Sequence, residues 1–157
     1  MEIKCTDKKT FQLVDNGQFA GQLIYDNLFS YKAKIILKNS DCYEIETVGF
    51  FGTSITITKD GQEIANLKMN WKGQIVISFQ DEREFVFKAQ GTFLNKYFIE
   101  NKEEEKLIQF TPNFNWSMFT YSYDISYDKK PEDILVVLLG VYAANYFIAV
   151  MSGAIVA

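Results

Sequence analysis

The stretch from residue 131 to residue 157, PEDILVVLLGVYAANYFIAVMSGAIVA, decides the fold of this chain. Pro131 suits the first position of a helix, and Glu132 and Asp133 suit its first turn, beside the positive end of the helix dipole. The segment from residue 134 to residue 157 contains no charged residue and is apolar on every side. A helix of this composition lies either inside a protein core or across a membrane.

Length leaves both arrangements open, since about 24 residues at 1.5 Å per residue span roughly 36 Å, which is enough to cross a bilayer. Small residues such as Gly140 and Ala143 favour burial, because they let strands approach closely. Asn145 also favours burial, because a protein interior can satisfy an amide that hydrocarbon would penalise. We therefore predict a buried central helix over residues 131–157, with a tail-anchored transmembrane helix over 134–157 as the alternative.

The chain before this helix alternates apolar and polar residues with the period of two that indicates β-strands. The clearest run is residues 121–127, YSYDISY, and Asp60-Gly61 lies between two such runs as a hairpin turn. We predict a mainly β fold in which about twelve short antiparallel strands over residues 10–128 close into a barrel. A closed barrel of more than about eight strands has a lumen that its own side chains cannot fill, and the apolar helix can fill it.

Composition limits the classes of function. A chain of 157 residues fits one domain, which we place at residues 1–157. The net charge is −4, and Arg83 is the only arginine among 16 basic residues, so we expect no nucleic-acid partner. Residues 1–4 are polar, unlike the apolar region of a signal peptide, so we expect none here, and Cys5 and Cys42 have no metal-ligand spacing. We expect a monomeric cytoplasmic protein with reduced thiols.

The chain contains no histidine, which removes histidine-based triads, histidine metal sites and the usual general base at neutral pH. It has no phosphate-binding loop, dinucleotide fingerprint or nucleophile elbow. Glu44 and Glu46 share a strand face and could in principle pair as acid and base, but a solvated outer face is the simpler interpretation. We expect no catalytic activity, no cofactor and no metal.

One binding site is suggested by lysine spacing. Lys32, Lys34 and Lys38 fall on the same face of one predicted strand, so with its apolar face toward the core they project outward together. Such a row can contact anionic lipid headgroups, at about 1 kcal/mol per lysine near an anionic membrane. The alternative is that outer lysines only keep the protein soluble. Trp71 and Trp116 each follow an Asn near a predicted turn, and we expect them to pack over a barrel end rather than form a ligand-binding lip.

Many short strands followed by a terminal apolar helix resemble the tubby C-terminal-like superfamily, which includes LURP-one-related proteins and phospholipid scramblases. The resemblance covers nearly the whole chain, and its most telling stretches are ITITKDG (55–61), MNWKG (69–73), FNW (114–116) and residues 134–151. It implies a barrel of about twelve strands around the C-terminal helix. Tubby-type domains bind phosphoinositides through basic side chains alternating on strands, and the lysine row looks similar. The chain has no match to the calcium-binding, Pro-rich or Cys-rich segments of scramblases. The expected function is a non-enzymatic binding or scaffold module with anionic membrane lipid as its partner.

Overall fold

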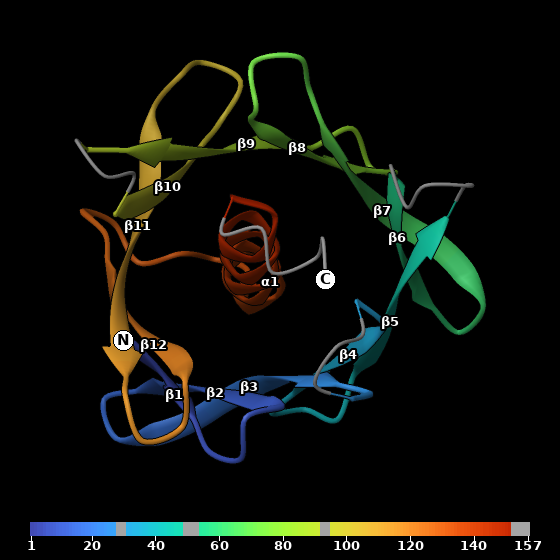
Figure 1. Ribbon diagram of the computed structural model, residues 1–157. Helices are drawn as coiled ribbons and strands as arrows, with labels where there is room; N and C mark the ends of the chain where they lie inside the picture. Colours follow the sequence, from blue (N-terminus) through green and yellow to red (C-terminus); the bar gives the residue numbers. More distant parts are fainter. Residues whose placement is uncertain (28–30, 49–53, 92–94, 152–157) are drawn as a thin grey trace.

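Twelve strands close into one antiparallel barrel around a single helix in the computed structural model, which describes residues 1–27, 31–48, 54–91 and 95–151. Figure 1 looks along the barrel, with the helix at the centre of the ring of strands. The predicted mainly β barrel with a buried C-terminal helix is therefore confirmed. The strands are β1 (Glu2–Cys5), β2 (Thr10–Asp15), β3 (Gln18–Tyr25), β4 (Ala33–Leu37), β5 (Cys42–Val48), β6 (Ser54–Lys59), β7 (Gln62–Met69), β8 (Ile75–Phe79), β9 (Glu84–Gln90), β10 (Lys96–Glu100), β11 (Lys106–Asn115) and β12 (Thr120–Ser126), and the helix is α1 (Ile134–Met151).

Each strand pairs with its neighbours in the chain, and β1 closes the barrel by pairing with β12. The closing register places Glu2 opposite Asp124 and Ile3 opposite Tyr123. The sequence pattern placed the start of the barrel at residue 10, but the barrel begins earlier, with β1. Strand β1 has four residues and buries only Ile3, so its alternation is too short to be recognised in the sequence.

The helix begins later than its sequence signals suggested. Asp133 was expected within the first turn, but it is the residue that caps the helix. Its Oδ1 accepts a hydrogen bond of 3.0 Å from the Leu135 backbone N–H. Arg83 donates to the other carboxylate oxygen of Asp133 at 2.9 Å and so ties the β8–β9 hairpin to the start of α1. Pro131 and Glu132 precede the helix, and residues 152–157 of the predicted helix lie outside the described residues.

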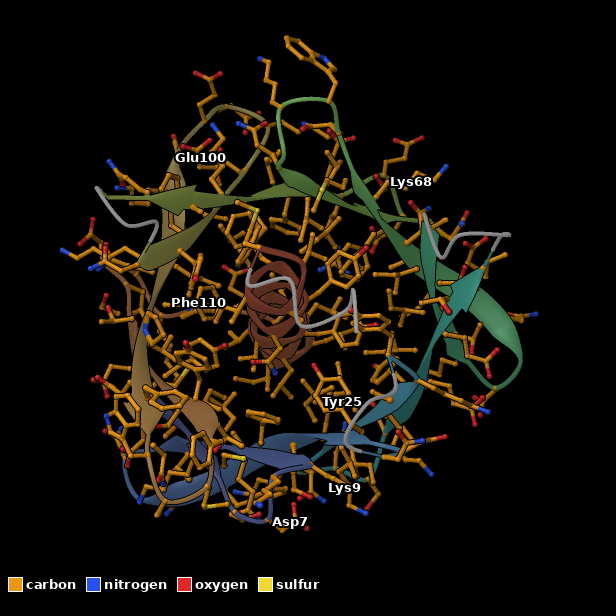
Figure 2. All side chains as sticks on the ribbon, in the orientation of Figure 1. Asp7, Lys9, Tyr25, Lys68, Glu100 and Phe110 are labelled. Atoms are coloured by element: carbon orange, nitrogen blue, oxygen red, sulfur yellow. The ribbon has the colours of Figure 1, made fainter. Side chains whose placement is uncertain are left out.

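Inward-pointing residues of every strand form one hydrophobic core with α1, and Figure 2 shows Tyr25 and Phe110 pointing toward the helix while Lys9 and Lys68 point away. Ten consecutive helix residues, 135–144, are buried. At Gly140 the helix approaches the wall so closely that an added Cβ would lie 2.8 Å from Ile99 Cδ1 and closer still to the Phe110 ring. By length and composition α1 could also cross a membrane, but in this arrangement its apolar surface faces the strands.

The connections define two ends of the barrel. Strands β1, β3, β5, β7, β9 and β11 finish at one end, which we call the mouth, and the other six finish at the opposite end, which we call the base. Helix α1 starts at the base, where Arg83 bonds to Asp133, and runs toward the mouth. There Tyr142 donates a hydrogen bond of 2.7 Å to the Tyr31 carbonyl oxygen.

Candidate functional site at the mouth of the barrel

The three lysines predicted as a binding row are all exposed, but they do not form a compact basic patch. Lys32 precedes β4 at the mouth, Lys34 lies within the strand, and Lys38 follows it at the base. The neighbouring strand β5 brings acidic side chains beside two of them. Lys32 Nζ lies 3.5 Å from Glu46 Oε1, and Lys34 stands directly opposite Glu44. Glu44 and Glu46 are exposed, as a solvated outer face requires, and they offset the charge of the row.

The mouth carries the most exposed aromatic side chains of the described residues. Trp71 in the β7–β8 hairpin is 91% exposed, and Trp116 and Phe119 in the β11–β12 hairpin are 77% and 75% exposed. The prediction that the tryptophans pack over a barrel end is therefore wrong. We call Trp71, Trp116 and Phe119 the aromatic rim.

An asparagine folds the turn beside each tryptophan of the rim. Asn70 Oδ1 accepts hydrogen bonds of 3.0 Å from the backbone N–H groups of Lys72 and Gln74. Asn115 Oδ1 accepts from the backbone N–H of Ser117 at 3.0 Å. An asparagine side chain that bonds to the backbone two residues on closes a tight turn. The residue after each asparagine, which is the tryptophan, is left at the tip of the hairpin.

Neighbouring side chains hold the rim in place. Phe114 lies edge-on to Trp116, with ring centroids 4.7 Å apart, and also contacts Tyr121 at 5.1 Å. Lys72 Nζ lies 5.4 Å from the centre of the Trp71 ring, within the range of a cation–π contact. The aromatic rim is thus partly ordered before any partner binds.

Charge is divided between the two ends of the barrel. The described residues at the mouth include more basic side chains (Lys8, Lys9, Lys32, Lys68, Lys72 and Lys96) than acidic ones (Asp7, Asp26 and Glu46). At the base the acidic side chains (Asp15, Asp41, Asp60, Asp81, Glu82, Glu84, Glu100, Glu103, Glu104, Glu105, Asp128, Glu132 and Asp133) outnumber the basic ones (Lys38, Lys59, Arg83, Lys102, Lys106, Lys129 and Lys130). The mouth is therefore the more positive end of an acidic protein.

A polar network lies beneath the mouth, inside the barrel. Tyr123 donates a hydrogen bond of 2.6 Å to Asn145 Oδ1, and Asn145 Nδ2 donates to the Tyr25 hydroxyl at 3.1 Å. Burial raises the pKa of Tyr25, Tyr123 and Tyr142, so these hydroxyls stay protonated at neutral pH. The network satisfies Asn145, as predicted for a buried helix, and offers no general base.

One hollow close to the mouth is lined by apolar side chains and Tyr146, and it is large enough for only about one water molecule. Within the described ranges, no group of three or more Cys, Asp or Glu side chains is placed to hold a metal ion.

Comparison with known proteins adds no relative: no family model, no curated protein and no solved structure matches the chain. The resemblance to the tubby C-terminal-like superfamily stays a prediction that rests on the order of strands and helix.

Proposed function

We propose that this protein is a non-enzymatic binding module that attaches to membrane surfaces rich in anionic phospholipid, with its mouth toward the membrane. The main support for this proposal is the division of charge between the two ends of the barrel. Lysines such as Lys8, Lys72 and Lys96 at the mouth would approach anionic headgroups, while Glu103 and its acidic neighbours at the base would be repelled. The protein would therefore be oriented on the membrane despite its net charge of −4.

The interior of the barrel supports a binding role rather than a catalytic one. Helix α1 fills the lumen, where a larger barrel would hold a substrate. The buried tyrosine hydroxyls are partnered, and their raised pKa values make them poor bases at neutral pH. The features that remain for interaction are the charges and aromatic side chains on the outside.

Co-sedimentation with lipid vesicles tests this proposal. We expect the full-length protein to bind phosphatidylcholine vesicles that contain phosphatidylserine and to bind pure phosphatidylcholine vesicles more weakly. Added salt should release the protein from the vesicles, because it screens the charges. Lys72→Glu with Lys96→Glu should weaken binding. Lys102→Glu with Lys129→Glu makes the same change of charge at the base and should leave vesicle binding unchanged. Equal binding to both vesicle types at every salt concentration would contradict the proposal.

The lysine row is tested in the same assay. Lys32→Glu with Lys34→Glu changes the side of the barrel, where Glu46 and Glu44 already offset the positive charge. We expect a smaller effect than that of the mouth variant. If the row variant alone abolishes binding, the protein contacts lipid through the side of the barrel and not through the mouth.

A further inference from the structure

We infer that the aromatic rim inserts into the interfacial layer of a lipid bilayer, so that the β7–β8 and β11–β12 hairpins anchor the mouth to the membrane. This inference rests on the proposed function and adds an apolar contact to the electrostatic attraction. It names a contact surface, Trp71 on one hairpin and Trp116 with Phe119 on the other, that the lysine spacing in the sequence did not suggest.

The position of the exposed apolar residues is the first argument. A monomeric protein commonly exposes single apolar side chains scattered over its surface. Here nine large hydrophobic residues are exposed in the described part of the chain, and all except Phe19 lie at the mouth. The set at the mouth consists of Val48, Met69, Trp71, Phe114, Trp116, Phe119, Val150 and Met151. This concentration at one end indicates a surface that is covered in use.

The spread of these residues around the rim is the second argument. They belong to β5, β7, the two aromatic hairpins, β11 and the end of α1, and Figure 1 shows β7 and β12 on different sides of the central helix. A small molecule could not contact both hairpins at once. A bilayer offers a broad surface, and Phe119 and the two tryptophans can enter it together from opposite sides of the mouth.

The chemistry of the rim favours a bilayer over a protein partner. Tryptophan is enriched at the boundary between headgroups and acyl chains, because its ring is apolar and its N–H is polar. Lys72 lies beside the Trp71 ring, so its ammonium group can reach a phosphate while the ring lies deeper. The excess of lysine at the mouth and of acidic residues at the base gives the orientation that insertion of the rim requires.

The turns reduce the cost of insertion. Asn70 and Asn115 fix the two hairpins through side-chain hydrogen bonds, and the contact of Phe114 with Trp116 restrains the larger aromatic group. A contact surface that is ordered in advance loses less conformational entropy when it binds. The rim can therefore enter the interface without refolding of the barrel.

Tryptophan fluorescence gives a direct test, because Trp71 and Trp116 are the only tryptophans in the protein. The single-tryptophan variants Trp71→Phe and Trp116→Phe would each be mixed with phosphatidylcholine vesicles that contain phosphatidylserine. We expect the emission of the remaining tryptophan to shift to the blue in both variants. Lipids brominated on their acyl chains should quench both residues, since both would lie near the acyl boundary.

A matched pair of variants measures the contribution to affinity. Trp71→Ser with Trp116→Ser should weaken co-sedimentation at least about tenfold, which corresponds to the loss of about 1.4 kcal/mol. Phe19→Ser removes the exposed large aromatic residue that lies away from the mouth and should leave binding unchanged. Circular dichroism of each variant would establish that the barrel is intact.

The outcomes separate this inference from the proposed function. Sedimentation with vesicles but no change in either tryptophan would overturn the inference and leave the proposed function standing. A blue shift with equal binding to pure phosphatidylcholine would support insertion of the rim and overturn the preference for anionic lipid. No binding to any vesicle would overturn both. A blue shift that depends on protein concentration without vesicles would assign the rim to a second copy of the chain and would overturn the inference.

Discussion

Tyr123 on β12 donates a hydrogen bond of 2.6 Å to the side-chain oxygen of Asn145 on α1. The amide nitrogen of Asn145 donates in turn to the Tyr25 hydroxyl on β3 at 3.1 Å. One helix residue thus joins two strands that lie on different parts of the barrel wall. Together with the hydrogen bond from Tyr142 to the Tyr31 carbonyl oxygen, this directional pair helps to fix the position of the helix in the lumen.

Replacing Asn145 should destabilise the barrel. Asn145→Leu leaves the Tyr123 and Tyr25 hydroxyls without their partner, and we expect a loss of about 1 to 3 kcal/mol in the free energy of unfolding, measured by urea denaturation. The double variant Asn145→Leu with Tyr123→Phe should lose less than the sum of the two single variants, because both changes remove the same hydrogen bond. Strict additivity would show that the bond does not contribute to stability.

Removing the helix should unfold the barrel. A chain truncated to residues 1–130 lacks α1, whose buried side chains contact the inward face of the strands. We expect the truncated chain to lose its cooperative thermal transition, while the full-length protein is soluble without detergent and melts sharply. A folded, soluble truncated chain beside a full-length protein that needs detergent would instead identify residues 134–157 as a membrane anchor.

Gly140 should not tolerate a methyl group. Alanine would improve the helix propensity by about 1 kcal/mol, but its Cβ would meet Ile99 at 2.8 Å and the Phe110 ring at a shorter distance. Overpacking of this kind costs about 1 to 3 kcal/mol, so we expect Gly140→Ala to lower the melting temperature. Phe110→Leu should restore part of the loss in the double variant. A more stable Gly140→Ala protein would place the helix farther from the wall.

The protein should lose stability at alkaline pH, because three of its tyrosine hydroxyls are buried. Burial raises the pKa of Tyr25, Tyr123 and Tyr142, so the folded state holds these protons more tightly than the unfolded state, whose tyrosines titrate near 10. The stabilisation is complete below pH of about 10 and is lost as the pH rises above that value. Parallel measurements of tyrosinate absorbance and circular dichroism would check this.

The two signals should separate the tyrosines into groups. Because burial raises the pKa of Tyr25, Tyr123 and Tyr142, these three side chains are expected to ionise only as the circular dichroism signal disappears. Tyr142→Phe removes one buried hydroxyl and should reduce the slope of stability against pH in this range. Ionisation of all tyrosines before unfolding would contradict the buried network.

Most of the architecture could be predicted from local patterns. Alternation along residues 121–127 identified β12, and the turn at Asp60-Gly61 was confirmed as a hairpin in which both residues have positive φ. The absence of charge after Asp133 predicted an apolar helix that is either buried or in a membrane, and the number of strands predicted a lumen that could receive it. These features depend on residues close together in the sequence, so the sequence alone determines them.

The properties of the surface could not be predicted in this way, because they depend on which residues are neighbours in space. A period of two gives the face on which Lys34 lies, but only the register between β4 and β5 places Glu44 opposite it. The alternating direction of the strands likewise places Trp71 and Trp116 at one end of the barrel, where both are exposed and do not pack over it as we expected. The sequence therefore determined the elements and the core, because burial follows local periodicity. Only the tertiary structure decided which charges are offset and which aromatic side chains share the mouth, because these depend on pairing between distant segments.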